Sequence, residues 1–165
     1  MIQTLTLHTV VRVYDSLLEL PTDEQDLLLK AREACDTAYA PYSNFHVGAA
    51  ILLADGTVVI GSNQENLAYP SGLCAERTAV YYTGANHKGI PILKIAVAAF
   101  QPSFAKYMPA NPCGACRQAL LEYENKQPTP IRVILEGEKN KVYVVDSVEC
   151  LLPLRFKAEF MGLVE

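Results

Sequence analysis

The sequence predicts an α/β protein, a three-layer α/β/α sandwich in which helices cover both faces of a mixed five-stranded sheet. Helical and β-rich segments follow one another in the order helix, two strands, helix, strand, helix, two strands, helix. Asp55-Gly56 separates two apolar, β-rich runs and is the strongest hairpin signal in the chain. Residues 137–141 connect the last two strands, and this connector is too short for a parallel crossover of a dozen or more residues. We therefore expect the last two strands to be antiparallel.

The first helix follows a stretch whose role the sequence leaves open. Residues 4–14 alternate like a strand, but nothing in the sequence names a partner for them. After Pro21, Thr22 and Gln25 have the spacing of a capping box, which predicts the start of a helix. Apolar residues then recur at helical spacing, and we expect the helix to end at Pro41.

The remaining elements are bounded by apolar runs and by helix-ending residues. The helix that begins at Cys74 is expected to end near Gly84. The last helix is expected to be capped by Asp146 or Ser147 and stopped by Pro153. Two strands are expected within 45–63, one on either side of Asp55-Gly56. Three further strands are expected at 92–100, 131–136 and 142–146, and a helix is expected at 113–126.

Composition narrows the class of protein. The chain of 165 residues shows no internal repeat or linker, so we expect one domain over 1–165. Its net charge is -4 and it has no long run of Lys or Arg, which argues against a nucleic-acid partner. No segment approaches the ~18 apolar residues needed to cross a membrane. The N-terminus lacks the pattern of a signal peptide, so we expect a cytoplasmic protein with no membrane partner.

Three of the five cysteines form a pattern typical of a metal site. An odd number of cysteines without a secretory signal disfavours a disulfide framework. Cys113 and Cys116 form a Cys-x-x-Cys motif, and a redox function for it would leave Cys74 unexplained. Three protein ligands leave the fourth position of Zn²⁺ open for water, as in a catalytic zinc site. The other cysteines, Cys35 and Cys150, are expected to be buried thiols, and His8, His46 and His87 are expected to be incidental.

The residues around this cluster suggest proton transfer. Three thiolates on one Zn²⁺ leave a net charge of 2 − 3 = −1, which Arg77 is expected to offset by donating to sulfur. Arg117 is a second candidate for that role, with a surface salt bridge as the alternative. Glu76 is either a solvated acid in the first helical turn or, beside an anionic metal centre in an apolar cavity, a proton carrier with a raised pKa. The combination Cys-Ala-Glu…Pro-Cys-x-x-Cys is the three-cysteine signature of zinc-dependent deaminases and favours the second role.

At these motifs the chain resembles the homotetrameric cytidine deaminases, a resemblance that spans about 36–156. It comprises AYAPYSNFHVGAAIL, NQENLAYPSGLCAERTAV, NPCGACRQAL and ECLLPLRF. Residues 1–21 have no counterpart and form an N-terminal extension of unknown role. Asn111 stands where serine is frequent, but the contact expected there uses its main-chain carbonyl.

The resemblance implies roles for residues that the sequence alone would leave as loop or core positions. The catalytic residue would be Glu76, and Cys74, Cys113 and Cys116 would hold one zinc ion per subunit. Substrate contacts would come from Asn63 and Glu65 (ribose hydroxyls), Phe45 (base), the amide of Ala75 (pyrimidine carbonyl), and the stretch Leu67 to Tyr69 with Phe156, which would reach a neighbouring subunit's pocket in a homotetramer.

The implied activity is hydrolytic deamination of cytidine and deoxycytidine to uridine and deoxyuridine, with release of ammonia. Three alternatives remain open at the level of sequence. They are a deaminase of a modified aminonucleoside such as blasticidin S, a non-catalytic scaffold stabilised by zinc, and an editor of nucleic acid. The acidic surface disfavours the editor, and an antiparallel pair of closing strands would resemble the free-nucleoside branch more than the tRNA editors.

Overall fold

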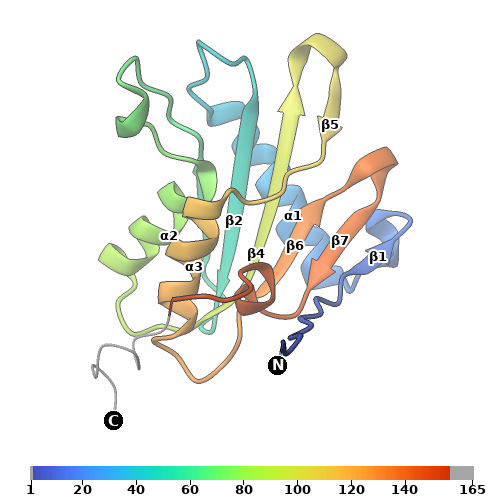
Figure 1. The fold of residues 1–165 in the computed structure, drawn as a ribbon. Coiled ribbons are helices and arrows are strands. Elements are labelled where there is room, and N and C mark those ends of the chain that lie inside the picture. The colour runs from blue at the N-terminus through green and yellow to red at the C-terminus, as the bar shows by residue number, and fades with distance from the viewer. Residues whose placement is uncertain (1, 157–165) are drawn as a thin grey trace.

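The computed structural model describes residues 2–156 and shows one mixed sheet between two helical layers (Figure 1). The strands lie side by side in the order β1-β7-β6-β4-β2-β3, and β5 pairs with β4 beyond this path. The helices are α1 (Thr22–Ala34), α2 (Ala75–Asn86) and α3 (Gly114–Glu124), and the strands are β1 (Arg12–Tyr14), β2 (His46–Leu53), β3 (Val58–Ser62), β4 (Ile92–Gln101), β5 (Lys106–Met108), β6 (Arg132–Glu136) and β7 (Val142–Val145).

All five expected strands form, and their directions follow the predictions. β2 and β3 make an antiparallel hairpin whose turn places Gly56 at a φ of 87°, a value that favours glycine. β6 and β7 are antiparallel, as the short connector predicts. β4 and β6 run parallel, which makes the sheet mixed. Two strands of three residues, β1 and β5, extend the sheet beyond the predicted five.

The N-terminal strand-like residues have a partner that sequence did not name. Arg12–Tyr14 form β1, which pairs antiparallel with β7 and covers its free edge. The side chain of Arg12 also pairs with Asp146, just after β7. Part of the N-terminal extension is therefore built into the sheet.

Each face of the sheet buries its own apolar layer. α1 lies on one face, and α2 and α3 lie side by side on the other (Figure 1). In the central strand β4, Ala96 and Ala98 pack toward α1, whereas Ile95 and Val97 belong to the core under α2 and α3. Alternating side chains are thus buried on both faces, which explains why β4 is an almost continuous apolar run.

Several helix ends differ from the predictions. The capping box does not form, because α1 already begins at Thr22 and the Gln25 amide instead donates to the Leu20 carbonyl at 2.8 Å. α1 also ends at Ala34 and passes into a 3₁₀ turn over Cys35–Thr37, before Pro41 is reached. The first helix therefore has the predicted start, without the predicted side-chain cap, and ends earlier than Pro41.

The ends of the later helices also depend on packing. α2 continues past Gly84 to Asn86, and the Tyr123 side chain of α3 packs against Gly84, where a Cβ would lie 2.4 Å from the Tyr123 hydroxyl. The last expected helix is only a 3₁₀ helix over Val148–Leu151. Its predicted cap is present, since the Ser147 side chain accepts from the Glu149 amide.

A second close approach fixes the start of α2. A Cβ at Gly61 of β3 would lie 2.6 Å from the Ala79 nitrogen and 2.9 Å from the Ala75 carbonyl. Only glycine lets the first turn of α2 rest directly on β3. Among the described residues, no helix is both long and apolar enough to span a membrane.

Candidate metal and substrate site

The first turns of α2 and α3 bring the three predicted cysteine ligands together. Cys74 immediately precedes α2, Cys113 immediately precedes α3, and Cys116 lies in the first turn of α3. The Cys113 sulfur lies 3.9 Å from that of Cys74 and 3.4 Å from that of Cys116, and all three sulfurs lie within 4.8 Å of one another. Free amides at helix starts favour thiolates, and three clustered thiolates suit Zn²⁺.

The cluster lowers the pKa of one thiol. The pKa of Cys74 is lowered to about 5, first by a hydrogen bond with Cys116 and then, against the effect of burial, by Arg77. The pKa of the buried Cys116 thiol is raised first by its hydrogen bond with Cys74, then by its burial and by the negative charge of Glu76. A divalent cation at this position would favour the thiolate form of all three.

Glu76 lies beside the cysteines and is buried. It is the second residue of α2, and only 4% of its surface is exposed. Burial raises the pKa of its carboxyl above the usual range, and the negative charge of Cys74 raises it further. A carboxyl with a raised pKa is suited to accept and return a proton near neutral pH.

The structure distinguishes the two arginines that sequence proposed as partners of the sulfurs. The Arg77 Nη2 lies 3.8 Å from the Cys74 sulfur, and its buried Nε has no hydrogen-bond partner among the described residues. An unpartnered buried donor beside the cluster fits sulfurs that carry extra negative charge in a metal complex. Arg117 instead donates to the main-chain carbonyls of Pro112 and Leu151, and among residues 2–156 it makes neither the expected sulfur contact nor the alternative salt bridge.

A cavity of about 450 Å³ reaches Cys74 of this cluster. Its lining includes Cys74 and Arg77 together with Asn63 and Glu65. Its size is in the range of small-molecule sites. The structure therefore places the predicted ribose-binding pair and one of the three clustered cysteines, Cys74, in the lining of one cavity.

Asn63 and Glu65 are both held by the chain around the start of β2. The Asn63 side chain accepts from the Val47 amide at 2.8 Å and donates to the Phe45 carbonyl at 2.9 Å. The Glu65 carboxylate accepts from the Tyr42 amide at 2.9 Å and from the Ser43 hydroxyl at 2.5 Å. The Ser43 hydrogen bond is the main cause that lowers the pKa of Glu65.

Sequence reasoning assigned no role to Tyr42 or Ser43, although both line the cavity. The sequence shows that they follow Pro41. Their contacts with Glu65, however, join residues more than twenty positions apart. No spacing within the chain indicates such a contact.

The other predicted substrate residues occupy different environments. Phe45 is half-buried against the core beneath α2 and α3, and Ala75 is fully buried as the first residue of α2. Leu67 and Tyr69 are 79% and 75% exposed on a loop, where Tyr69 makes an edge contact with the Tyr42 ring. Phe156 is 61% exposed and is not part of the cavity lining.

Comparison with known proteins agrees with this geometry. Residues 21–129 match the family model described as the cytidine and deoxycytidylate deaminase zinc-binding region. A cytidine deaminase of Halalkalibacterium halodurans is 39% identical over 140 residues, which cover 85% of this chain and 98% of the relative. A cytidine deaminase of Sporosarcina psychrophila is 38% identical over 138 residues, with 83% and 93% covered.

Solved structures give the same result. The crystal structure of a cytidine deaminase from Burkholderia pseudomallei superposes with a TM-score of 0.67 at 41% identity, covering 79% of this chain and 97% of that one. The cytidine deaminase from Mycobacterium tuberculosis superposes with a TM-score of 0.64 at 33% identity, covering 83% and 99%. With its mixed sheet, its three helices and its matching zinc-binding region, the chain belongs to the cytidine and deoxycytidylate deaminase family, as its sequence predicts.

Proposed function

We propose that this protein catalyses the hydrolytic deamination of cytidine and deoxycytidine to uridine and deoxyuridine, with release of ammonia. The observation that carries the proposal is the buried carboxyl of Glu76 beside the three clustered thiols, of which Cys74 lines a cavity together with Asn63 and Glu65. A site that only stabilised the fold would have no need of an acid with a raised pKa at this point.

Cys74, Cys113 and Cys116 would hold one Zn²⁺ per subunit, and Arg77 would donate to the Cys74 sulfur. Three protein ligands leave one position open to solvent, as catalytic zinc sites require. When bound, zinc supplies Lewis-acid activation of water. Arg77 offsets part of the negative charge that three thiolates bring to the centre.

Glu76 moves the protons of the reaction. Its carboxylate takes a proton from the attacking water and delivers it to N3 of the cytosine ring as the oxygen adds to C4. It then takes the second water proton and transfers it to the amine, so that the C4–N4 bond breaks and ammonia leaves. Water and cytidine thus give uridine and ammonia, and Glu76 returns to its starting state. Its raised pKa supports both halves of this cycle.

Asn63 and Glu65 would hold the ribose hydroxyls. Each uses only part of its hydrogen-bonding capacity within the chain: Asn63 Nδ2 has a second N–H, and the Glu65 carboxylate has further lone pairs. The base would then extend toward Cys74, with Phe45 packing on it and the amide of Ala75, free at the start of α2, donating to the pyrimidine carbonyl. The antiparallel β6–β7 pair also supports a free nucleoside over tRNA.

Leu67, Tyr69 and Phe156 would complete the pocket of a neighbouring subunit in a homotetramer. Their exposure in the single chain leaves them available for such a contact. We also expect the protein to act in the cytoplasm, where the clustered thiols stay reduced and able to bind metal.

One assay tests the proposal. The purified protein is incubated separately with cytidine, deoxycytidine and blasticidin S while the ultraviolet absorbance and the released ammonia are followed. We expect both cytosine nucleosides to react and blasticidin S to remain. Turnover of blasticidin S alone would identify the modified-nucleoside deaminase, and silence on all three with zinc bound would favour the scaffold.

A further inference from the structure

The position of Cys113 depends on a loop rather than on a helix. Cys113 is the exposed member of the cluster and the last residue before α3, at the end of residues 109–113. Upstream, the amide of Ala110 donates to the Glu136 carbonyl at 3.0 Å, which ties the start of this loop to the end of β6. The part of the loop next to the Cys113 sulfur is held by Arg117.

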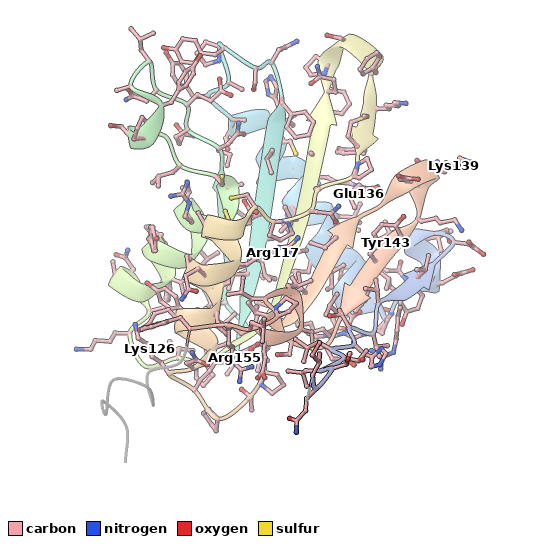
Figure 2. All side chains as sticks on the ribbon, viewed as in Figure 1. Arg117, Lys126, Glu136, Lys139, Tyr143 and Arg155 are labelled. Atoms are coloured by element: carbon pink, nitrogen blue, oxygen red, sulfur yellow. The ribbon has the colours of Figure 1, made fainter. Side chains whose placement is uncertain are left out.

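Arg117 donates to the carbonyl of Cys113 and to that of the preceding residue, Pro112. Its main-chain amide donates to the Cys113 carbonyl at 3.0 Å, as the first turn of α3 requires. Its side chain turns back along the helix, and Nε donates to the Pro112 carbonyl at 2.8 Å. The two peptide units that flank Cys113 are thus fixed by one residue, which projects from the first turn of α3 (Figure 2).

The same guanidinium also reaches the C-terminal segment. Its Nη1 donates to the Leu151 carbonyl at 2.8 Å, at the end of the 3₁₀ helix Val148–Leu151. The start of that 3₁₀ helix is held to the far end of α3 by Glu124, which accepts from the Val148 amide at 2.9 Å. The segment is therefore fastened at both ends of α3, and Phe156 lies five residues beyond the Arg117 contact.

We propose that Arg117 is a positioning residue that sets Cys113 for metal binding through Pro112 and sets the course of the C-terminal segment through Leu151. Its acceptors are two neutral carbonyls, so it acts through geometry, whereas Arg77 acts on the charge of the sulfurs. Arginine suits the task because Nε and Nη1 donate in fixed, separate directions, and a lysine ammonium cannot reproduce that fork. The inference rests on the proposed zinc site and extends it to a residue that touches neither metal nor substrate.

The test compares Arg117→Met and Arg117→Lys with a matched control, Gln127→Ala. Gln127 follows the other end of α3, and it likewise fastens separate main-chain segments through its side chain, at Ile92 and Thr129. The readouts are the rate at which zinc passes to a colour-forming chelator, the visible spectrum of the Co²⁺-substituted protein, and Tm. Outer contacts of this kind change metal affinity by ~10–100-fold, so we expect zinc release from Arg117→Met to be at least tenfold faster, with an altered Co²⁺ spectrum.

Arg117→Lys should fall between the wild type and Arg117→Met, since its ammonium can donate to the carbonyls but does not hold them in fixed directions. It replaces Arg117→Met if that variant does not fold. Gln127→Ala should lower Tm but release zinc at the wild-type rate. The proposal is overturned if the Arg117 variants keep the wild-type release rate and spectrum, or if Gln127→Ala accelerates release as much as they do. A wild type that binds zinc but deaminates nothing would overturn the proposed function and leave this comparison intact.

Discussion

The Nη2 of Arg77 lies 3.8 Å from the sulfur of Cys74, three residues earlier at the start of the same helix. The neighbouring Nε is buried and unpartnered among the described residues. A guanidinium held in this way brings positive charge to a cluster that would carry a net charge of −1 with zinc. The contact therefore links the first turn of α2 to the chemistry of the metal.

Replacing Arg77 should weaken the zinc site by changing its charge. In Arg77→Met the apolar stem is kept but the donors are lost, so we expect zinc affinity to fall ~10–100-fold and kcat to fall with it. Arg77→Lys should retain part of the affinity, because the charge remains without the planar donors. Competition with a chelator measures the affinity, and equal zinc retention in all three proteins would contradict the role.

Replacing Asn63 should affect both stability and substrate binding, whereas replacing Glu65 should affect mainly substrate binding. Asn63→Ala leaves the Val47 amide and the Phe45 carbonyl without their partner, at a cost of about 2 kcal/mol, so we expect a lower Tm as well as a higher KM. Glu65→Gln removes a charged acceptor at the exposed side of the cavity. We expect KM to rise about tenfold with little change in Tm. Thermal unfolding and steady-state kinetics on both variants check the contrast, which fails if Glu65→Gln loses as much stability as Asn63→Ala.

The ion pair between Arg12 of β1 and Asp146 should make the stability of the fold depend on pH in the acid range. Hydrogen bonding to Arg12 lowers the pKa of Asp146 below its usual value. A lowered pKa means that the unfolded chain binds the proton more readily. The stabilisation is therefore present above the ordinary pKa of about 3.9 and is lost as pH falls through the lower folded value.

Asp146→Asn should accordingly unfold at a lower temperature than the wild type at neutral pH, and the difference should narrow below about pH 3.9. Asp26→Asn provides the control, because Asp26 is exposed and makes no ion pair among the described residues. Thermal unfolding followed by circular dichroism across this range gives the measurement. A difference that stays constant from neutral to acid pH would contradict the account.

The N-terminal extension should support the edge of the sheet without taking part in the metal site. Deleting residues 2–15 removes β1 from β7, its ion pair with Asp146 and the hydrogen bond from Thr9 to the Cys150 carbonyl. We expect a loss of about 2 kcal/mol, which corresponds to a Tm lower by ~4–8 °C for a chain of this length. Zinc content per chain should be unchanged. Loss of zinc from a folded truncated protein would show that the extension reaches the site.

The sequence predicted those features of the fold that depend on a short stretch of the chain, such as a turn or a connector. Asp55-Gly56 predicted one hairpin, and the short 137–141 connector predicted the direction of the closing pair. The pairing of Arg12–Tyr14 with β7 escaped, because a three-residue strand carries no information about a partner more than a hundred positions away. The contact of Gly84 with Tyr123 of α3 escaped for a related reason, because only the packed structure brings the two helices together.

The site was predictable to the extent that its residues form motifs. Cys74, Glu76 and Arg77 stand together at a helix start, and Cys113 and Cys116 stand in a second motif, so their joint role was expected. The hydrogen bond from Arg117 to Leu151 and the one from Ser43 to Glu65 each join residues that are far apart in the chain. Both are formed by main-chain carbonyls or hydroxyls that leave no pattern in the sequence.

The central claim is that Glu76 moves the protons at a zinc ion held by the three cysteines, and Glu76→Gln tests it most directly. The measurement pairs zinc content per chain with kcat for cytidine, followed by ultraviolet absorbance, in Glu76→Gln and the wild type. Glutamine keeps the size of the side chain but cannot carry the proton, so we predict unchanged zinc content and a loss of kcat of at least ~10²-fold. A zinc-loaded Glu76→Gln protein with near-normal kcat would contradict the account.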